Sequence, residues 1–356
     1  MPDGCIKKFS VGTLRKPLLV PFRIATGEHR ILDNVLMTIH LADGTVGRGE
    51  AAVATHITGE TIARTSANLK RAGRHLQGKQ AADYLQHSVW LHRHFAENPC
   101  AVAAAEMALM DARCRQMGIP LWRLFGNKPS RLTTDITIVI GDLKETEQHA
   151  RRYYRQGFRA FKIKIGRNPD EDFQRVAAVH RAVKRSAIYL DANQAFTVSQ
   201  MLVFLKSLER AGIHPQLVEQ PVPREDWDGL KEISHRSHCI VCADESARSL
   251  EDVRRIIRTK AARAVNIKLM KFGLVRGAEA ARLAKSAGLK LMIGGMMESN
   301  LAMTAAAHMA AGLGIFDYID LDTPFFVKGE VRANPTLQSD GVYDLSVVKK
   351  GIGIQA

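Results

Sequence analysis

The sequence lacks the features that mark secreted, membrane or disulfide-rich proteins. Its five cysteines are few, odd in number and widely scattered, which excludes a disulfide framework and predicts a reducing, cytoplasmic location. The first ten residues contain no apolar stretch, so we expect no signal peptide. The best apolar run, residues 299–316, is rich in alanine but contains Asn300 and His308. It therefore predicts a buried helix, not a membrane span.

The composition is that of an ordinary globular protein. The 356 residues are 46% hydrophobic and 24% charged, and this length suits two domains at about 150 residues each, or one large barrel with an addition. The net charge is +15, but basic residues alternate with acidic ones, as in Arg224-Glu225-Asp226, and no long basic run is present. We therefore expect a solvated basic surface and no nucleic-acid partner.

From about residue 135 onward, short β-type runs alternate with helical stretches. Polar or glycine residues near the ends of the last seven runs recur every 24 to 28 residues, the length of one βα unit. This repeat predicts a (β/α)8 TIM-type barrel over residues 126–328. An open doubly wound sheet is the alternative, but no G-x-G-x-x-G follows a strand. The eight predicted strands are Asp135–Ile140, Ala160–Ile165, Ala187–Leu190, Gln216–Val218, Cys239–Ala243, Ala264–Ile267, Leu289–Ile293 and Tyr318–Leu321.

Residues 1–125 have a different pattern, which predicts a separate α+β domain. Ile31–Ile39 and Thr45–Gly49 flank a short Asp-Gly turn and predict a hairpin. Pro99–Met117 predicts a helix rich in alanine and methionine. We expect the C-terminal segment, residues 329–356, to pack back on this first domain.

Three carboxylates follow three consecutive predicted strands: Asp191, Glu219 and Asp244. The carboxyl ends of barrel strands surround one site, where these side chains would repel one another unless a cation lay between them. Hard oxygen ligands select Mg²⁺ or Mn²⁺ over zinc. The alternative is that each carboxylate caps the helix that follows it. We favour one divalent cation.

Two lysines, Lys164 and Lys268, lie on the second and sixth predicted strands, across the barrel from each other. A lysine acts as a base towards a weak carbon acid when desolvation or neighbouring positive charge lowers its pKa. Lys162 lies on the same strand face as Lys164 and supplies such charge. Lysines on opposite sides permit proton removal on one face and return on the other, which inverts a stereocentre. The alternative is that they only neutralise carboxylates.

A different metal site is conceivable at His235, His238, Cys239 and Cys242, whose spacing suits zinc on one helix face. However, Cys239–Ala243 has the composition of a strand, which would turn the two cysteines to opposite sides. We therefore expect no zinc there.

Five motifs, in order along the chain, resemble those of the enolase superfamily in its muconate-lactonizing subgroup. The N-terminal Gly49-Glu50-Ala51 and Glu106-Met107-Ala108-Leu109 resemble the capping domain of that family, so the resemblance covers nearly the whole chain. The five motifs are Phe161-Lys162-Ile163-Lys164-Ile165-Gly166, Asp191-Ala192-Asn193-Gln194, Val218-Glu219-Gln220-Pro221, Ala243-Asp244-Glu245-Ser246 and Asn266-Ile267-Lys268-Leu269-Met270-Lys271.

The resemblance implies a site for one Mg²⁺ per subunit, with Mn²⁺ as a substitute, on Asp191, Glu219 and Asp244. It also implies that Lys164 and Lys268 are the acid/base catalysts. Lys162 would support Lys164 and the enolate. We also expect a homo-oligomer.

The D-x-D motif of Asp320 and Asp322 is similar to that of dipeptide epimerases, where it holds the substrate's N-terminal ammonium. Two carboxylates on one strand face suit charge-assisted hydrogen bonds to a cation. The predicted function is thus a Mg²⁺-dependent dipeptide epimerase that inverts the α-carbon of the C-terminal residue by two-base transfer through an enediolate. The alternatives are a cycloisomerase, an N-acylamino acid racemase and an o-succinylbenzoate synthase of the same subgroup, in which two aspartates would repel an anionic substrate.

Specificity stays open in the sequence. Arg23, Thr137 and Glu298 are further candidates for substrate contact. The chain has Gly27 where Ala-Glu-specific members carry an arginine, and Gly273 is followed by Leu274 instead of a second glycine. Glu28 and Glu298 would favour a basic side chain, whereas Met296 and Met297 would favour an apolar one. The candidate specificity segments are Phe22–Arg30 and Ala52–Thr58.

Overall fold

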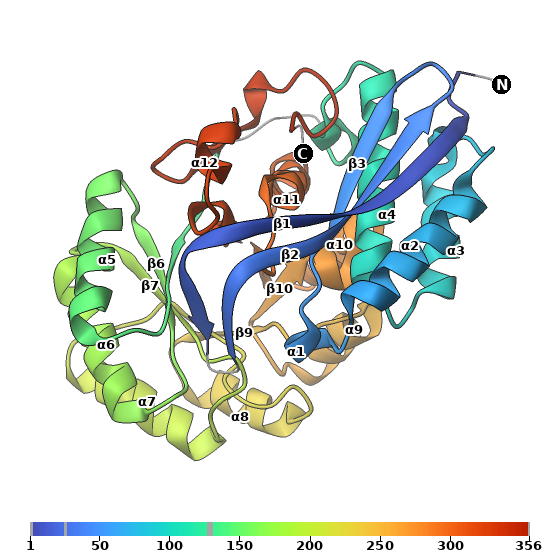
Figure 1. The fold of residues 1–356 in the computed structure, drawn as a ribbon. Coiled ribbons are helices and arrows are strands. Elements are labelled where there is room, and N and C mark those ends of the chain that lie inside the picture. The colour runs from blue at the N-terminus through green and yellow to red at the C-terminus, as the bar shows by residue number, and fades with distance from the viewer. Residues whose placement is uncertain (1–2, 25–26, 127–130, 355–356) are drawn as a thin grey trace.

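A computed structural model describes residues 3–24, 27–126 and 131–354. It contains a three-stranded antiparallel sheet with its helices and an eight-stranded parallel sheet surrounded by helices (Figure 1). The long strands β1 (Ile6–Ile24) and β2 (Gly27–Leu41) leave the first sheet and lie across the barrel.

The N-terminal sheet has the order β1-β2-β3, with β3 at Val46–Ala51. The predicted hairpin is therefore observed, and β1 adds a strand that the sequence pattern did not predict. The sheet packs on α4 (Pro99–Gln116), and the approach is close: a Cβ atom at Gly49 would lie 1.9 Å from the Ala104 carbonyl oxygen. Glycine at this position permits the contact. The remaining helices are α1 (Thr55–Thr58), α2 (Ile62–Leu76) and α3 (Tyr84–His94).

Eight parallel strands form the second sheet, in the spatial order β12-β11-β10-β9-β8-β7-β6-β5. The backbone N–H of Asp135 donates to the Ile319 carbonyl at 2.9 Å and so links the first strand to the last. The predicted TIM-type barrel is confirmed. The strands are β5 (Ile136–Ile138), β6 (Ala160–Lys164), β7 (Ala187–Asp191), β8 (Leu217–Glu219), β9 (Ile240–Ala243), β10 (Ala264–Lys268), β11 (Lys290–Gly294) and β12 (Tyr318–Ile319).

Seven helices connect these strands in sequence, whereas β12 is followed by a 3₁₀ turn, Thr323–Phe325, and by the short α12 (Glu330–Ala333). The buried α11 confirms the prediction made for the alanine-rich run. Among the described residues, no helix combines the length and apolar character needed to cross a bilayer. The seven helices are α5 (Leu143–Gln156), α6 (Pro169–Ala182), α7 (Val198–Arg210), α8 (Trp227–Arg236), α9 (Leu250–Thr259), α10 (Leu269–Ser286) and α11 (Asn300–Leu313).

The C-terminal segment contacts both parts of the chain. Its strand β13 (Val342–Asp344) pairs with β4 (Arg131–Thr133), and the Ile352 N–H donates to Asp111 on α4 at 2.8 Å. The limits 1–125, 126–328 and 329–356 themselves stay a prediction.

All five cysteines are buried, and Cys100, Cys114, Cys239 and Cys242 are free thiols. Cys242 on β9 packs inside the barrel against Leu217 and Met292, whereas Cys239 belongs to the main core outside that layer. Because the two thiols lie in different layers, they do not form a shared zinc site.

Candidate active site

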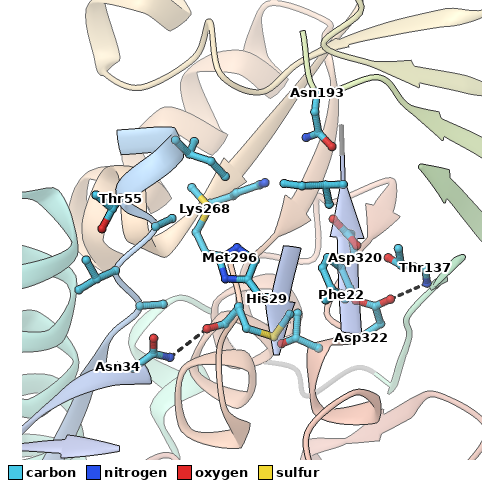
Figure 2. A pocket seen from close by; sticks show the side chains of 18 of the residues that line it. Phe22, His29, Asn34, Thr55, Thr137, Asn193, Lys268, Met296, Asp320 and Asp322 are labelled. Atoms are coloured by element: carbon cyan, nitrogen blue, oxygen red, sulfur yellow. Dashed lines mark hydrogen bonds between the residues drawn. The ribbon is translucent and has the colours of Figure 1, made fainter. Parts of the chain in front are cut away.

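A cavity of about 320 Å³ opens at the carboxyl end of the barrel strands, between the barrel and β1–β2. Lys268 enters it from one side and the Asp320/Asp322 pair from the other (Figure 2). Seven of the predicted site residues line this cavity: Thr137, Lys162, Lys164, Asp244, Lys268, Asp320 and Asp322.

The predicted metal ligands Asp191, Glu219 and Asp244 are all buried, at or directly after the ends of adjacent strands. None of them caps the helix that follows. The caps of α7, α8 and α9 are made by Thr197, Asp226 and Ser249, which accept backbone N–H groups. The capping alternative is therefore excluded. Of the three carboxylates, Asp244 lines the cavity.

Lysines pair with the three carboxylates. Lys162 Nζ lies 3.1 Å from Asp191 Oδ2 and 2.6 Å from Glu219 Oε2. Lys268 Nζ lies 2.7 Å from Asp244 Oδ2. Within the described ranges, a different set of three carboxylates has oxygens within 4.8 Å of one another: Asp135 and the D-x-D pair, Asp320 and Asp322.

The residues fit a divalent cation by charge and by donor type. Glu245 Oε2 is a buried oxygen that accepts no hydrogen bond from the described residues, whereas Glu219 Oε2 has the Lys162 ammonium beside it at 2.6 Å. Eight carboxyl groups and four lysines are buried at this end of the barrel interior, so oxygen donors outnumber ammonium groups. Carboxylate oxygens are the hard donors that Mg²⁺ prefers. The eight acids are Asp135, Asp191, Glu219, Asp244, Glu245, Glu298, Asp320 and Asp322, and the lysines are Lys162, Lys164, Lys268 and Lys271.

Burial and neighbouring charges shift the pKa values of these carboxyl groups. Burial and the neighbouring Asp191 raise the pKa of Glu219 to about 7. Burial and Asp244 raise the pKa of Glu245 to about 8. Burial acts on Asp191 in the same direction, but Lys162 and Lys164 outweigh it and hold the pKa of Asp191 below its usual range.

The two predicted acid/base lysines are both buried and paired. Lys164 Nζ lies 2.5 Å from Asp191 Oδ2 and 3.3 Å from Asn193 Oδ1. Burial lowers the pKa of Lys268, but Asp244 and Glu219 outweigh it, so the pKa of Lys268 is raised. This direction is opposite to the lowered pKa expected of a base. The cause is the carboxylate of Asp244, itself a predicted cation ligand.

Lys271 is a member of the site that sequence reasoning did not single out. Its Nζ donates to Asp244 Oδ1 at 2.5 Å and to the Asn266 carbonyl at 3.0 Å. Its position three residues after Lys268 was the available signal, because a helix that starts at the strand end turns both lysines towards one carboxylate.

The D-x-D pair forms the opposite wall. Asp320 Oδ2 accepts a hydrogen bond from Lys162 at 2.8 Å, and Asp322 Oδ2 accepts one from the backbone N–H of Thr137 at 2.5 Å. Burial and Asp320 raise the pKa of Asp322 to about 7. Lys162 also pairs with Asp191 and Glu219, so its charge is shared. A further positive charge could therefore bind at this wall.

Two predicted contact residues lie outside the cavity lining. Arg23 on β1 pairs with Glu28 at 2.7 Å. Glu298 is buried and accepts the Met296 N–H at 2.6 Å. Roles for Arg23 and Glu298 in substrate binding stay predictions, and neither glutamate offers a counter-charge inside the cavity.

Apolar side chains make most of the outer cavity wall. They come from β1, β2, the 52–58 segment, α2 and the loop after β11. These residues are Phe22, Ile24, Ile31, Val53, Ile57, Ile62, Met296 and Met297.

Comparisons with known proteins agree with this architecture. Residues 8–126 match the family model "Mandelate racemase / muconate lactonizing enzyme, N-terminal domain", and residues 145–356 match "Enolase C-terminal domain-like". The chain is 49% identical over 350 residues to a hydrophobic dipeptide epimerase from Citrifermentans bemidjiense, covering 96% of this chain and 95% of that protein. It is 32% identical to an L-Ala-D/L-Glu epimerase from Bacillus subtilis, covering 98% and 96%.

A solved structure has a similar fold. The dipeptide epimerase from Enterococcus faecalis, crystallised with Mg and the dipeptide L-Leu-L-Tyr, superposes with a TM-score of 0.94 at 30% identity, covering 99% of this chain and 100% of that one. The chain therefore belongs to the mandelate racemase / muconate lactonizing enzyme family of the enolase superfamily and is an isomerase of the racemase and epimerase type.

Proposed function

We propose that the protein is a Mg²⁺-dependent dipeptide epimerase that inverts the α-carbon of an apolar C-terminal residue. One observation carries the proposal: an acidic D-x-D wall and the buried Lys268 face each other across one small cavity (Figure 2). A dipeptide with a free N-terminus supplies the ammonium that this acidic wall lacks. The cytoplasmic location and the homo-oligomeric state stay predictions.

The substrate ammonium would lie against Asp320 and Asp322, where charge-assisted hydrogen bonds are strongest. The amide links this group to the α-carbon of the second residue, which would then lie further into the cavity. An N-acyl or cycloisomerase substrate places an anion or a neutral group at the same wall. Two carboxylates reject such a substrate.

Asp191, Glu219 and Asp244 would hold the cation, and Mn²⁺ is expected to substitute because it accepts the same oxygen ligands. When bound, the cation supplies positive charge beside the substrate carboxylate, which makes the adjacent C–H bond more acidic. A cation on Asp244 would also compete with Lys268 for that carboxylate. The charge that raises the pKa of Lys268 would then be reduced.

Lys164 and Lys268 would be the two bases. One lysine removes the α-proton, and the protonated lysine on the other side returns a proton to the opposite face of the planar enediolate. Lys162, buried against Asp320 and the metal-binding carboxylates, would keep its charge and stabilise the negative intermediate. The product is the epimer of the C-terminal residue.

The apolar outer wall favours an apolar side chain on that residue. Met296 and Met297 line the cavity, whereas Arg23 and Glu28 are paired with each other outside it. The titratable lining residues of this wall are His29 and Asp33 of β2, and Asp33 already pairs with Arg15 at 3.3 Å. A charged side chain would therefore be desolvated here with little compensation, which is costly. Relatives named for hydrophobic dipeptides support the same choice.

The test is a screen of L-Ala-L-Xaa dipeptides in deuterated water, read by mass spectrometry. The proposal predicts deuterium at the α-carbon of the C-terminal residue, with apolar residues exchanged fastest. Chelation of divalent cations should abolish exchange, and Mg²⁺ or Mn²⁺ should restore it. Exchange of N-acylated amino acids at a higher rate than dipeptides would instead support the racemase alternative.

A further inference from the structure

Asp135, which directly precedes β5, is a buried acid that the proposed mechanism does not use. It is 1% exposed, and both of its carboxylate oxygens lack a hydrogen-bond partner. Its backbone N–H donates to Ile319 where the barrel closes, so the residue is held firmly in place.

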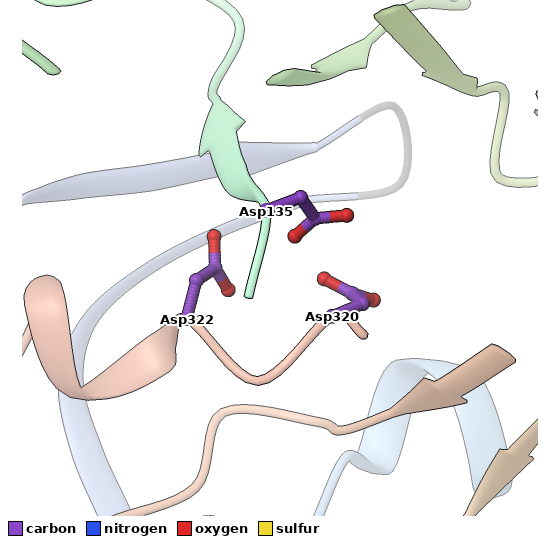
Figure 3. Close-up of side chains that lie close together, drawn as sticks. All are labelled: Asp135, Asp320 and Asp322. Carbon is purple, nitrogen blue, oxygen red and sulfur yellow. The ribbon is translucent and has the colours of Figure 1, made fainter. Parts of the chain in front are cut away.

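Its side chain points at the D-x-D pair. The carboxyl groups of Asp135, Asp320 and Asp322 face one another, with oxygens within 4.8 Å (Figure 3). Asp320 and Asp322 each accept a hydrogen bond, from Lys162 and from the Thr137 backbone respectively. Both line the cavity, whereas Asp135 does not. Asp135 therefore lies behind the substrate wall, beyond direct contact with a ligand there.

Three negative charges at this place would be poorly compensated. Lys162 is the ammonium in contact with the cluster, and it also contacts Asp191 and Glu219. Tyr189 on β7 is a further titratable group that interacts with Asp135. A buried carboxylate without a donor is strongly unfavourable. A proton on Asp135 removes this penalty and converts the group into a hydrogen-bond donor.

We propose that Asp135 is a neutral carboxylic acid that donates a hydrogen bond to Asp320 and thereby positions Asp320 for both Lys162 and the substrate ammonium. The cluster then carries two negative charges, which Lys162 and one ammonium balance. Burial first, and then Asp320 and Asp322, raise the pKa of Asp135, in agreement with this state. Asp135 is thus a positioning residue. The inference rests on the proposed function for its kinetic consequence, though not for its protonation state.

The decisive comparison is between Asp135→Asn and Asp135→Ala. Asparagine is neutral, has the same shape and keeps a donor towards Asp320, so we expect its kcat and KM to stay within about twofold of the wild type. Alanine loses the donor, so we expect KM for an apolar dipeptide to rise about tenfold or more, with a smaller change in kcat. If Asp135→Asn impairs dipeptide turnover as severely as Asp135→Ala, Asp135 acts as an anion and the proposal is overturned.

A readout independent of turnover separates this inference from the proposed function. Infrared difference spectra of the wild type and Asp135→Asn should show the carbonyl band of a protonated carboxyl group, which the variant loses. Absence of that band difference overturns the neutral-acid assignment even if dipeptides are epimerised. Conversely, if the band difference is present but the wild type does not turn over dipeptides, the proposed function is contradicted and the neutral-acid assignment is not. Because Asn is isosteric, the test does not depend on the folding of the alanine variant.

Discussion

The carboxylate of Glu50 lies at the N-terminus of α11 and accepts the backbone N–H of Ser299 at 2.9 Å. A residue of β3 thus caps a barrel helix. Asn34 on β2 donates to the same carboxylate at 2.6 Å and to the Met297 carbonyl at 2.9 Å. This network fixes the N-terminal sheet against the loop that carries the cavity-lining residues Met296 and Met297.

Glu50→Gln should lower the free energy of unfolding by about 2–3 kcal/mol, because its amide group directs a donor at buried donors and leaves polar groups unsatisfied. Denaturant unfolding measures the change. The matched control is Glu225→Gln, since Glu225 is exposed and should be substituted without a measurable effect. Equal stability of the two variants would show that the Glu50 network does not hold the sheet on the barrel.

Met296→Ala should raise KM for an apolar dipeptide about tenfold while kcat changes little. Met296 lines the cavity, so we expect its side chain to contact the substrate equally before and during the reaction. Steady-state kinetics with L-Ala-L-Leu and L-Ala-L-Ala test this. The loss should be larger for the leucine substrate. Met117→Ala is the control, since Met117 is exposed and distant from the cavity lining. A uniform loss on both substrates would argue against a specificity role.

His308 should make stability depend on pH. This buried residue of α11 accepts the Trp122 N–H at 3.1 Å through Nδ1, and Nε2 lies 3.0 Å from the Ile352 carbonyl. Burial lowers its pKa from 6.5 to about 4. Between pH 6.5 and 4 the unfolded chain binds a proton that the folded chain does not, so stability falls as pH falls, by about 3 kcal/mol over this window.

The variant His308→Gln keeps an acceptor and a donor but does not titrate. Comparison of its unfolding free energy with that of the wild type at pH 7 and pH 4.5 isolates the histidine from the many buried acids. The unfolding free energy of the wild type relative to that of His308→Gln should be about 2 kcal/mol lower at pH 4.5 than at pH 7. A constant difference would contradict the lowered pKa of His308.

Much of the barrel was predictable because each βα unit repeats at a nearly constant interval. Once the strands are known, parallel pairing turns their carboxyl ends to one mouth, which places Lys164, Asp191 and Lys268 together. Strand β1 was not predictable. Its run contains Pro17, Pro21 and several lysines and arginines, which interrupt the alternation expected of a strand.

Asp135 was missed for another reason. The sequence pattern places it as the first residue of the predicted strand Asp135–Ile140, and nothing local marks a single aspartate there as part of a site. It meets Asp320 because the barrel closes between its first and last strands. The hydrogen bond from Thr137 to Asp322 spans the same closure and joins residues that are 185 positions apart in the chain. Long-range closure of this kind has no short-range sequence signal.

The central claim is that Lys164 and Lys268 act on opposite faces of one α-carbon. The measurement is deuterium incorporation from deuterated water into L-Ala-L-Phe and L-Ala-D-Phe by the Lys164→Ala and Lys268→Ala variants with Mg²⁺ present. Each variant should lose epimerisation yet still exchange the α-hydrogen of one epimer. The epimer that the Lys164→Ala variant exchanges should be the opposite of the one that the Lys268→Ala variant exchanges. Exchange of the same epimer by both variants, or full epimerisation by either, would contradict the account.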